Sequence, residues 1–345
     1  MSHEVEGVDA ERVTAWFAEH VPEATAPLTF DLIAGGHSNL TYRVEDASGA
    51  AWVLRRPPLG NVLATAHDMG REHAVMAALG PTDVPVPRTR GLCTDEAVNG
   101  APFYVMDFVE GQVIRNGDLA RRLTEEQRAT AGRSIVDVLA RIHAVDVDAV
   151  GLGDLGRRED YLARQLKRWY GQWEKSKTRE LAVVEDVHAG LLAAVPPQPR
   201  STIVHGDYRL DNCLVGDDGE VVAVLDWEIC TLGDPLADAG LLLVYWSEPA
   251  DEHQIPANAP TAVGGFPSRA EVLDRYAEAS GLDVSRIDYY VAFGYWKLAC
   301  IVEGVYARYV GGAMGRERSG PEFDVFAQQV EMLAQAAAAA LERSA

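Results

Sequence analysis

Residues 203–228 read IVHGDYRLDNCLVGDDGEVVAVLDWE and place acidic and amide side chains around short apolar runs. Two apolar runs flank the turn formers at 216–219, which predicts a β-hairpin. A hairpin brings its two ends together, so we expect Asn212, before the outgoing strand, to face Asp226, after the return strand. Asp207 lies just upstream. Converging oxygen ligands suit a hard cation such as Mg²⁺, which keeps waters and substrate phosphates in its shell.

Outside this hairpin the chain has two regions of different sequence pattern, and the hairpin lies within the second. Residues 28–109 are rich in β-branched and aromatic residues bounded by turn formers, which predicts a strand meander interrupted by one helix near 67–79. From about residue 120 the apolar period becomes helical. Helices are predicted near 124–143, 158–178, 268–280, 286–310 and 321–342, and loops are predicted at 195–199 and 249–267, the second long enough for a lid or an insertion.

Composition excludes several classes of protein. The 345 residues carry 31 basic and 52 acidic side chains, a net charge of −21, which disfavours nucleic acid and anionic membranes as partners. No signal segment or bilayer-spanning run is recognised, so a cytoplasmic protein is expected. Four cysteines lie far apart without a C-x-x-C pair, and we expect buried free thiols rather than a disulfide framework or a zinc site.

The polar residues of the opening stretch carry a family resemblance. H-x-D-x-x-x-x-N at 205–212, with an aspartate fourteen residues later, is similar to the catalytic loop and metal-binding pattern of the protein kinases. The form HGD, with LDWEICTLGDPLADAGLL at 225–242, resembles the aminoglycoside and choline phosphotransferase family, and in particular its subgroup fused to acyl-CoA dehydrogenase-like domains in some eukaryotes. The resemblance implies an α+β, protein-kinase-like two-lobe fold. We expect a small β-rich nucleotide-binding lobe at 1–109 and a larger helical catalytic and acceptor-binding lobe at 110–345.

The resemblance also implies roles for residues of the hairpin and its approach. Asp207 is expected to accept the proton of a substrate hydroxyl, and Arg209 to contact the transferred phosphoryl group. Asn212 and Asp226 are expected to bind Mg²⁺, and His205 to hold the loop. The plain alternative is that these polar side chains only cap a turn. For Asp234 and Asp238, helix N-terminal caps are the preferred interpretation.

The N-terminal half offers candidate nucleotide ligands. Arg55 stands where the kinases have a lysine, so either it or Arg56 is expected to pair with the phosphates. Glu72 is the candidate partner of that arginine, with a solvated helix acid as the alternative. The other expected nucleotide-site residues belong to a Gly-Gly phosphate loop, a base sandwich and an adenine-binding hinge: Gly36, Ser38 and Asn39; Val53 and Leu214; Met106, Asp107 and Val109.

The function expected from these residues is ATP-dependent phosphorylation of a hydroxyl on a small molecule, with ATP and Mg²⁺ as cofactors. The subgroup favours a hydroxy acid or a hydroxyacyl thioester as the acceptor over an antibiotic. Two alternatives stay open: a nucleotide-binding module without turnover, and an accessory protein of acyl-CoA metabolism. The sequence does not indicate an oligomeric state.

Overall fold

The computed structural model describes residues 5–34, 39–59, 68–311 and 321–344. It divides into two compact units. The first comprises Met1–Val113, Asp148–Leu152 and Asp211–Cys230, and the second comprises Ile114–Val147, Gly153–Leu210 and Thr231–Ala345. The division at residue 109 stays a prediction about functional lobes. Beyond residue 109, the segments that cluster with the first unit are 110–113, 148–152 and 211–230, and the last of these contains the hairpin.

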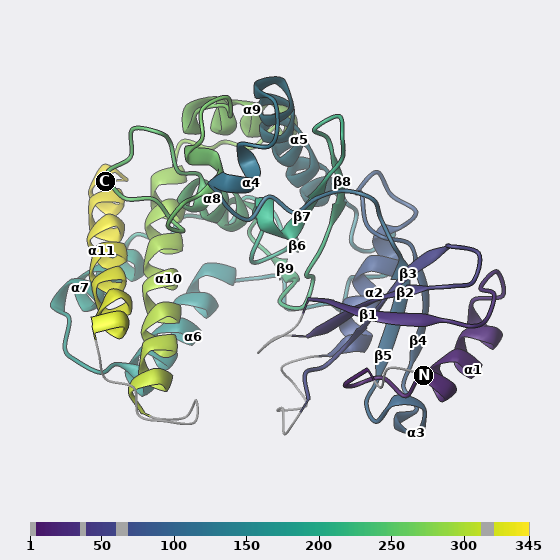
Figure 1. Ribbon diagram of the computed structural model, residues 1–345. Coiled ribbons are helices and arrows are strands. Elements are labelled where there is room, and N and C mark those ends of the chain that lie inside the picture. The colour runs from purple at the N-terminus through teal and green to yellow at the C-terminus, as the bar shows by residue number, and fades with distance from the viewer. Residues whose placement is uncertain (1–4, 35–38, 60–67, 312–320, 345) are drawn as a thin grey trace. The chain divides into compact units, whose positions relative to one another are not determined.

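The first unit is built on a five-stranded antiparallel sheet with the order β1-β2-β3-β5-β4 (Figure 1). Alternate side chains of β2 are buried, as expected for a strand with one face on a core. The predicted meander and its interrupting helix are therefore present. The strands are β1 (Thr29–Ala34), β2 (Leu40–Glu45), β3 (Ala51–Arg56), β4 (Thr89–Cys93) and β5 (Phe103–Asp107), and the helices are α1 (Ala10–His20), α2 (Met69–Leu79) and α3 (Glu96–Asn99).

Helix α1 covers part of this sheet, and the sequence analysis did not predict it. Asp9 caps the helix by accepting a hydrogen bond from the Arg12 N–H. The Trp16 ring meets Phe103 edge to face at 5.0 Å, so aromatic packing joins the helix to β5. The short helix α3 lies between β4 and β5 and is additional to the one helix predicted within the meander.

The predicted hairpin is present and belongs to the first unit. Strands β7 (Cys213–Val215) and β8 (Val221–Val224) pair antiparallel, with Cys213 opposite Val224. Gln112 exchanges two backbone hydrogen bonds of 2.9 Å with Val215. These bonds fix the hairpin to the segment that follows β5.

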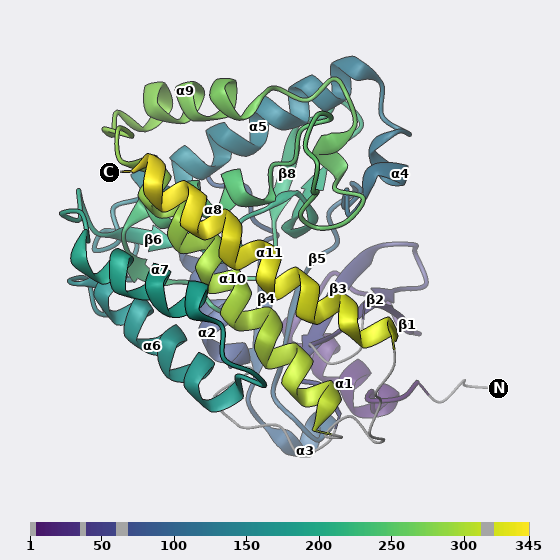
Figure 2. The same ribbon diagram turned by 90° about the vertical axis from the view of Figure 1, so that its left-hand side faces the viewer.

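The second unit is mainly helical. Helices α10 and α11 lie side by side, and α6 and α7 pack along α10 (Figure 2). Helix α8 is buried along most of its length, with Asp234 as its N-cap. Two short strands, β6 (Thr202–Val204) and β9 (Thr231–Gly233), pair beside it. The helices are α4 (Gly117–Ala120), α5 (Glu125–Ala144), α6 (Tyr161–Ser176), α7 (Ala182–Ala193), α8 (Pro235–Tyr245), α9 (Arg269–Ser280), α10 (Ile287–Val310) and α11 (Pro321–Arg343), with single 3₁₀ turns at Leu210–Asn212 and Pro260–Ala262.

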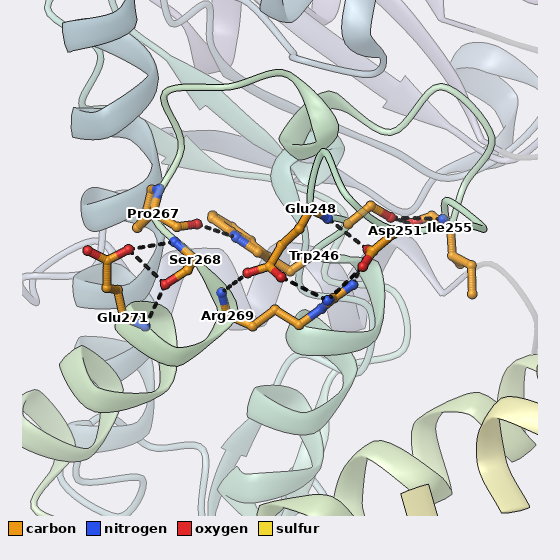
Figure 3. A network of polar contacts seen from close by, with 9 residues as sticks. Trp246, Glu248, Asp251, Ile255, Pro267, Ser268, Arg269 and Glu271 are labelled. Carbon is orange, nitrogen blue, oxygen red and sulfur yellow. Dashed lines mark hydrogen bonds and ion pairs between the residues drawn. The ribbon is translucent and has the colours of Figure 1, made fainter. Parts of the chain in front are cut away.

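The long loop between α8 and α9 is fixed at both ends (Figure 3). The Trp246 indole N–H donates to the Pro267 carbonyl at 2.8 Å. The Arg269 guanidinium contacts both Glu248, at 3.3 Å, and Asp251, at 3.1 Å. These contacts tie the start of the loop to the first turn of α9.

The four cysteines are buried free thiols, as predicted. None of the described helices combines the length and the apolarity that a bilayer crossing requires.

Candidate active site

The loop that follows β6 is held by a carboxylate from α8. Asp238 accepts hydrogen bonds from the backbone N–H groups of His205 at 2.6 Å and Gly206 at 2.8 Å. His143 from α5 approaches the same carboxylate, with Nε2 3.4 Å from Oδ2. Burial raises the pKa of Asp238, but the hydrogen bonds and charge interactions of the carboxylate with His143, His205 and the Gly206 N–H outweigh this effect, so the pKa lies below its usual value.

This arrangement corrects one interpretation of the sequence. Asp234 is the N-cap of α8, since its side chain accepts from the Leu236 N–H. Asp238, expected to be a second cap, instead holds the loop before Asp207. Both carboxylates stand at the start of the helix, and only the tertiary structure separates their roles.

A buried lysine contacts the same loop. The Lys297 ammonium on α10 donates to the Gly206 carbonyl at 2.9 Å and lies 5.6 Å from the centre of the Trp169 ring. Burial lowers the pKa of Lys297, while Asp207 and Asp238 oppose that shift. Gly206 has a φ of 86°, a conformation that favours glycine, and both of its backbone polar groups are bonded.

Asp207 presents a partly exposed carboxylate from this anchored loop. Its backbone N–H donates to His205 Nδ1 at 3.3 Å, and His205 is fully buried. Arg209 Nε lies 3.5 Å from Asp207 Oδ2, and its guanidinium stands 4.8 Å from the centre of the Tyr245 ring. His205 thus supports the loop as expected, and the structure brings Arg209 beside Asp207.

In the first unit, one arginine contacts two carboxylates. Arg55 Nη2 lies 2.6 Å from Asp226 Oδ1, and its Nε lies 3.2 Å from Glu72 Oε2. Glu72 is only 1% exposed, so it is not a solvated helix acid. Burial raises the pKa of Glu72, with Arg55 opposing the shift. Burial by itself lowers the pKa of Arg55, but the two carboxylates raise it above its usual value.

Arg56 lies in a different environment. Its guanidinium donates to the carbonyls of Gly7 and, at 3.0 Å, Asn99. Successive side chains of a strand point to opposite faces of the sheet, which explains why neighbouring arginines have separate partners. Of the two, Arg55 is the one that contacts Glu72 and Asp226.

Asp226 and Asn212 stand at the same end of the hairpin. The Leu225 N–H donates to the Asn212 carbonyl at 2.8 Å, next to Asp226. Asp226 has a φ of 65°, a left-handed conformation that is uncommon for a residue with a side chain and recurs at functional sites. One carboxylate and one amide suit Mg²⁺, which needs few protein ligands when substrate phosphates supply the others. Within the described ranges, no group of three or more His, Cys, Asp and Glu side chains could hold a metal ion.

Of the three residues predicted for the phosphate loop, Gly36 and Ser38 lie outside the described residues. Asn39 is buried, and its Nδ2 donates to Glu228 Oε2 at 3.3 Å. Its side-chain oxygen is buried without a hydrogen-bond partner among the described residues. The start of β2 is thereby joined to the segment just after Asp226.

The predicted hinge follows β5 directly. Met106 pairs with Val53 across the β3–β5 ladder. The Asp107 N–H donates to the Arg88 carbonyl at 2.9 Å, and its carboxylate pairs with Arg90. Val109 continues the segment, and its N–H has no hydrogen-bond partner in the part of the chain that the structure describes.

Leu214 of β7 lies against the end of this segment. A Cβ placed on Gly111 would come within 3.3 Å of the Leu214 Cβ. Within the first unit, Val53 thus lies opposite Met106 at the start of this segment and Leu214 lies beside Gly111 at its end.

Sequence reasoning missed Lys297 and His143 and misread Asp238. Lys297 stands in the middle of an apolar helix, ninety residues after Asp207. A charged residue inside an apolar helical run is a signal for a buried polar contact. Nothing in the local pattern identifies the partner.

Comparison with known proteins identifies relatives of this chain. Residues 29–281 match the phosphotransferase enzyme family. Acyl-CoA dehydrogenase family member 10 of Mus musculus is 34% identical over 301 residues, covering 84% of this chain and 27% of that protein. Probable acyl-CoA dehydrogenase IBR3 of Arabidopsis thaliana is also 34% identical, covering 86% of this chain and 38% of that protein. The chain thus spans about a quarter to two fifths of the length of these curated relatives.

A solved structure covers nearly the whole chain. A Ralstonia eutropha JMP134 protein, named for the aminoglycoside phosphotransferases, has a TM-score of 0.81 at 30% identity and covers 97% of this chain and 98% of its own. Further aminoglycoside phosphotransferases, some in complexes with ATP, ADP or GDP, share the fold at lower identity. The predicted kinase-like fold and the resemblance to the subgroup related to acyl-CoA dehydrogenases are therefore confirmed. The chain belongs to the phosphotransferase enzyme family.

Proposed function

We propose that the chain transfers the γ-phosphoryl group of ATP to a hydroxyl of a small molecule, with Mg²⁺ as the metal. The observation that carries this proposal is the position of Arg55, paired with Glu72 from α2 and Asp226 after β8. A buried arginine held by two carboxylates is pre-oriented, so binding phosphate costs it little side-chain entropy. Family membership and the nucleotide complexes of the relatives support nucleotide use.

Each predicted ligand has a place in this proposal. Arg55 would contact the phosphates, and Asn212 and Asp226 would hold Mg²⁺, which neutralises charge on the terminal phosphates when bound. Backbone groups of Asp107 and Val109 would bind the base, with Met106 beside them. Val53 and Leu214 would sandwich the base, and Gly36, Ser38 and Asn39 would cover the phosphates.

Asp207 would act as the general base of the transfer. Its carboxylate would accept the proton of the acceptor hydroxyl as that oxygen bonds to the γ-phosphorus, while the bond from phosphorus to the bridging oxygen breaks and ADP leaves. Asp238 and Lys297 would keep Asp207 in position through the preceding backbone. Arg209, 3.5 Å from the Asp207 carboxylate, would stabilise charge on the transferred group.

The acceptor we propose is a hydroxy acid or its thioester. The two curated relatives described above are named for acyl-CoA dehydrogenases and extend well beyond this chain. If a kinase domain is joined to an enzyme of thioester metabolism, a hydroxylated acyl group is a suitable acceptor for it, because both domains would then act on acyl compounds. The names of the structural relatives concern antibiotics, but an antibiotic acceptor is less well supported.

The decisive experiment is a screen of hydroxy acids, hydroxyacyl thioesters and aminoglycosides for an ATP-dependent gain of one phosphoryl group by mass spectrometry. An Asp207→Asn variant, run in parallel, controls for contaminating kinases. Phosphorylation by the wild type and not by the variant supports the proposal. ATP binding without transfer to any compound would instead favour the nucleotide-binding module, which the arginine at position 55 keeps open. Binding of thioesters without ATP use would favour the accessory protein of acyl-CoA metabolism.

A further inference from the structure

Helix α6 carries an unusual concentration of positive charge. Lys167, Arg168 and Lys175 lie three, four and eleven residues after Arg164, so the four side chains share one helical face. With Gly171 and Gln172 they line an open surface hollow of about 570 Å³. We call these four cations and the hollow between them the α6 basic face.

The charges of this face lack ion-pair partners in the part of the chain that the structure describes. Among the described residues, none of its four cations has a carboxylate oxygen within 4 Å, although the chain carries a net charge of −21. By contrast, Lys177 on the neighbouring turn pairs with Glu174 at 2.9 Å and Glu180 at 3.2 Å. Like charges at four-residue spacing, such as those of Arg164 and Arg168, destabilise a helix, so clustering these cations lowers the stability of α6.

The α6 basic face is connected to the loop that carries Asp207. The Arg168 guanidinium lies 5.2 Å from the centre of the Trp169 ring, and the Lys297 ammonium lies 5.6 Å from the same ring. Lys297 in turn donates to the carbonyl of Gly206, the residue before Asp207. A ligand on this face could therefore extend toward the catalytic loop within the same unit.

Arg164 provides a further polar group at the end of the face nearest the start of α6. Its Nη2 donates to the Arg157 carbonyl at 2.6 Å, which fixes the guanidinium. Its Nη1 is buried and has no hydrogen-bond partner among the described residues. A buried N–H donor without an acceptor is unfavourable, and an anion at this point would satisfy it.

We propose that the α6 basic face binds the phosphate groups of a coenzyme A thioester, and that such a thioester is the acceptor. This inference rests on the proposed function and adds the carrier to which the hydroxylated acyl group is attached. The cations extend over a stretch of twelve residues, about 16 Å of helix, which matches a ligand with several separated phosphates better than one small anion. Binding energy from this remote part of the acceptor would hold the acyl hydroxyl near Asp207.

The test is calorimetric binding of coenzyme A to the full chain, with Mg²⁺ and a saturating non-hydrolysable ATP analogue occupying the nucleotide site. Pantetheine, which lacks the phosphates, should bind far more weakly, and added salt should weaken the binding of coenzyme A. The triple variant Lys167→Glu, Arg168→Glu and Lys175→Glu should bind coenzyme A about ten- to a hundredfold more weakly, because three exposed charge contacts are reversed.

A matched control changes the net charge equally at exposed sites outside the face, with Arg121→Glu, Arg133→Glu and Arg286→Glu. It should bind coenzyme A like the wild type. The milder pair Lys167→Gln and Lys175→Gln tests the same point should the triple variant lose its helical circular dichroism.

Three results would overturn the inference. They are equal losses in the α6 triple variant and the control, equal binding of pantetheine and coenzyme A, and complete displacement of coenzyme A by the ATP analogue. Binding of the wild type, but not of the α6 variant, to phosphatidylserine vesicles in place of coenzyme A would overturn it as well. If phosphate-free acceptors are phosphorylated while coenzyme A does not bind, this inference fails and the proposed function stands. If coenzyme A binds at the face but no acceptor gains a phosphoryl group, the site stands and the proposed function fails.

Discussion

Replacing Asp238 with asparagine tests how the loop before Asp207 is held. The two carboxylate oxygens of Asp238 each accept a different backbone N–H, from His205 at 2.6 Å and from Gly206 at 2.8 Å. An asparagine has one oxygen and one NH₂ group, so one of these N–H donors must face another donor. The site thus loses one charge-assisted hydrogen bond and leaves a buried donor unpaired, which together should lower the free energy of unfolding by about 2–4 kcal/mol.

The matched control is Asp234→Asn, four residues earlier in the chain. The Asp234 oxygens accept from the Leu236 N–H at 3.0 Å and from the Tyr290 hydroxyl at 2.8 Å. A hydroxyl can rotate and accept from an amide, so both partners can remain bonded to the substituted side chain. We expect the free energy of unfolding of this variant at pH 7 to fall by no more than about 1 kcal/mol, because both hydrogen bonds are preserved.

Urea denaturation followed by circular dichroism, with separate transitions fitted where the two units unfold apart, measures both variants. Hydrogen exchange of the amides at 204–210 gives the local effect, and it should accelerate in the Asp238 variant only. The rate of phosphoryl transfer should fall in that variant while the KM for ATP changes little, because the nucleotide ligands proposed above lie elsewhere. Equal stabilities and equal exchange rates for the two variants would refute the role assigned to Asp238.

Four further outcomes are expected. Asp207→Asn should lower kcat by roughly a hundredfold to ten-thousandfold with little change in ATP affinity, and near-normal turnover would show that Asp207 is only a loop residue. Asp226→Ala should abolish turnover while the circular dichroism stays native, and wild-type activity that survives excess EDTA would contradict the metal site. Arg55→Ala should raise the KM for ATP and lower kcat, and Arg55→Lys should retain part of both because the charge remains, whereas a fully active alanine variant would exclude the role. Burial raises the pKa of Asp234 to about 6, so the stability contributed by its protonated form is complete below pH 3.8 and is lost as the pH rises through 6. The free energy of unfolding of Asp234→Asn, measured relative to the wild type, should therefore rise by up to about 3 kcal/mol between pH 4 and 8, and a constant difference would contradict the shift.

The sequence was informative where local patterns decide the structure. The hairpin of β7 and β8 follows from two short apolar runs around residues 216–219, and the β1–β3 meander follows from similar punctuation. Helices with long apolar periods, such as α5 and α10, were placed to within a few residues. In each case the relevant contacts lie close together in the chain.

The misses have different physical origins. Helix α1 had an available signal, since Asp9 precedes an amphipathic run containing Trp16 and Phe17, and it was overlooked. Asp238 was misread because the first turn of a helix is an ordinary place for a capping aspartate. The contact made by Lys297 could not be predicted from the sequence, because its partner is the backbone carbonyl of Gly206. Every residue has a backbone carbonyl, so the residue type gives no indication of such a partner.

The ion pair of Arg55 with Asp226 has a thermodynamic consequence. In the free protein the carboxylate proposed to hold Mg²⁺ already has a cationic partner at 2.6 Å, so the metal must share or displace it. Under the proposed function, a nucleotide would offer Arg55 new anionic partners and would thereby release Asp226. Metal and nucleotide should therefore bind with positive cooperativity, and by linkage the factor by which ATP tightens Mg²⁺ must equal the factor by which Mg²⁺ tightens ATP. Under the proposed function, the protein would bind little free magnesium until a nucleotide is bound.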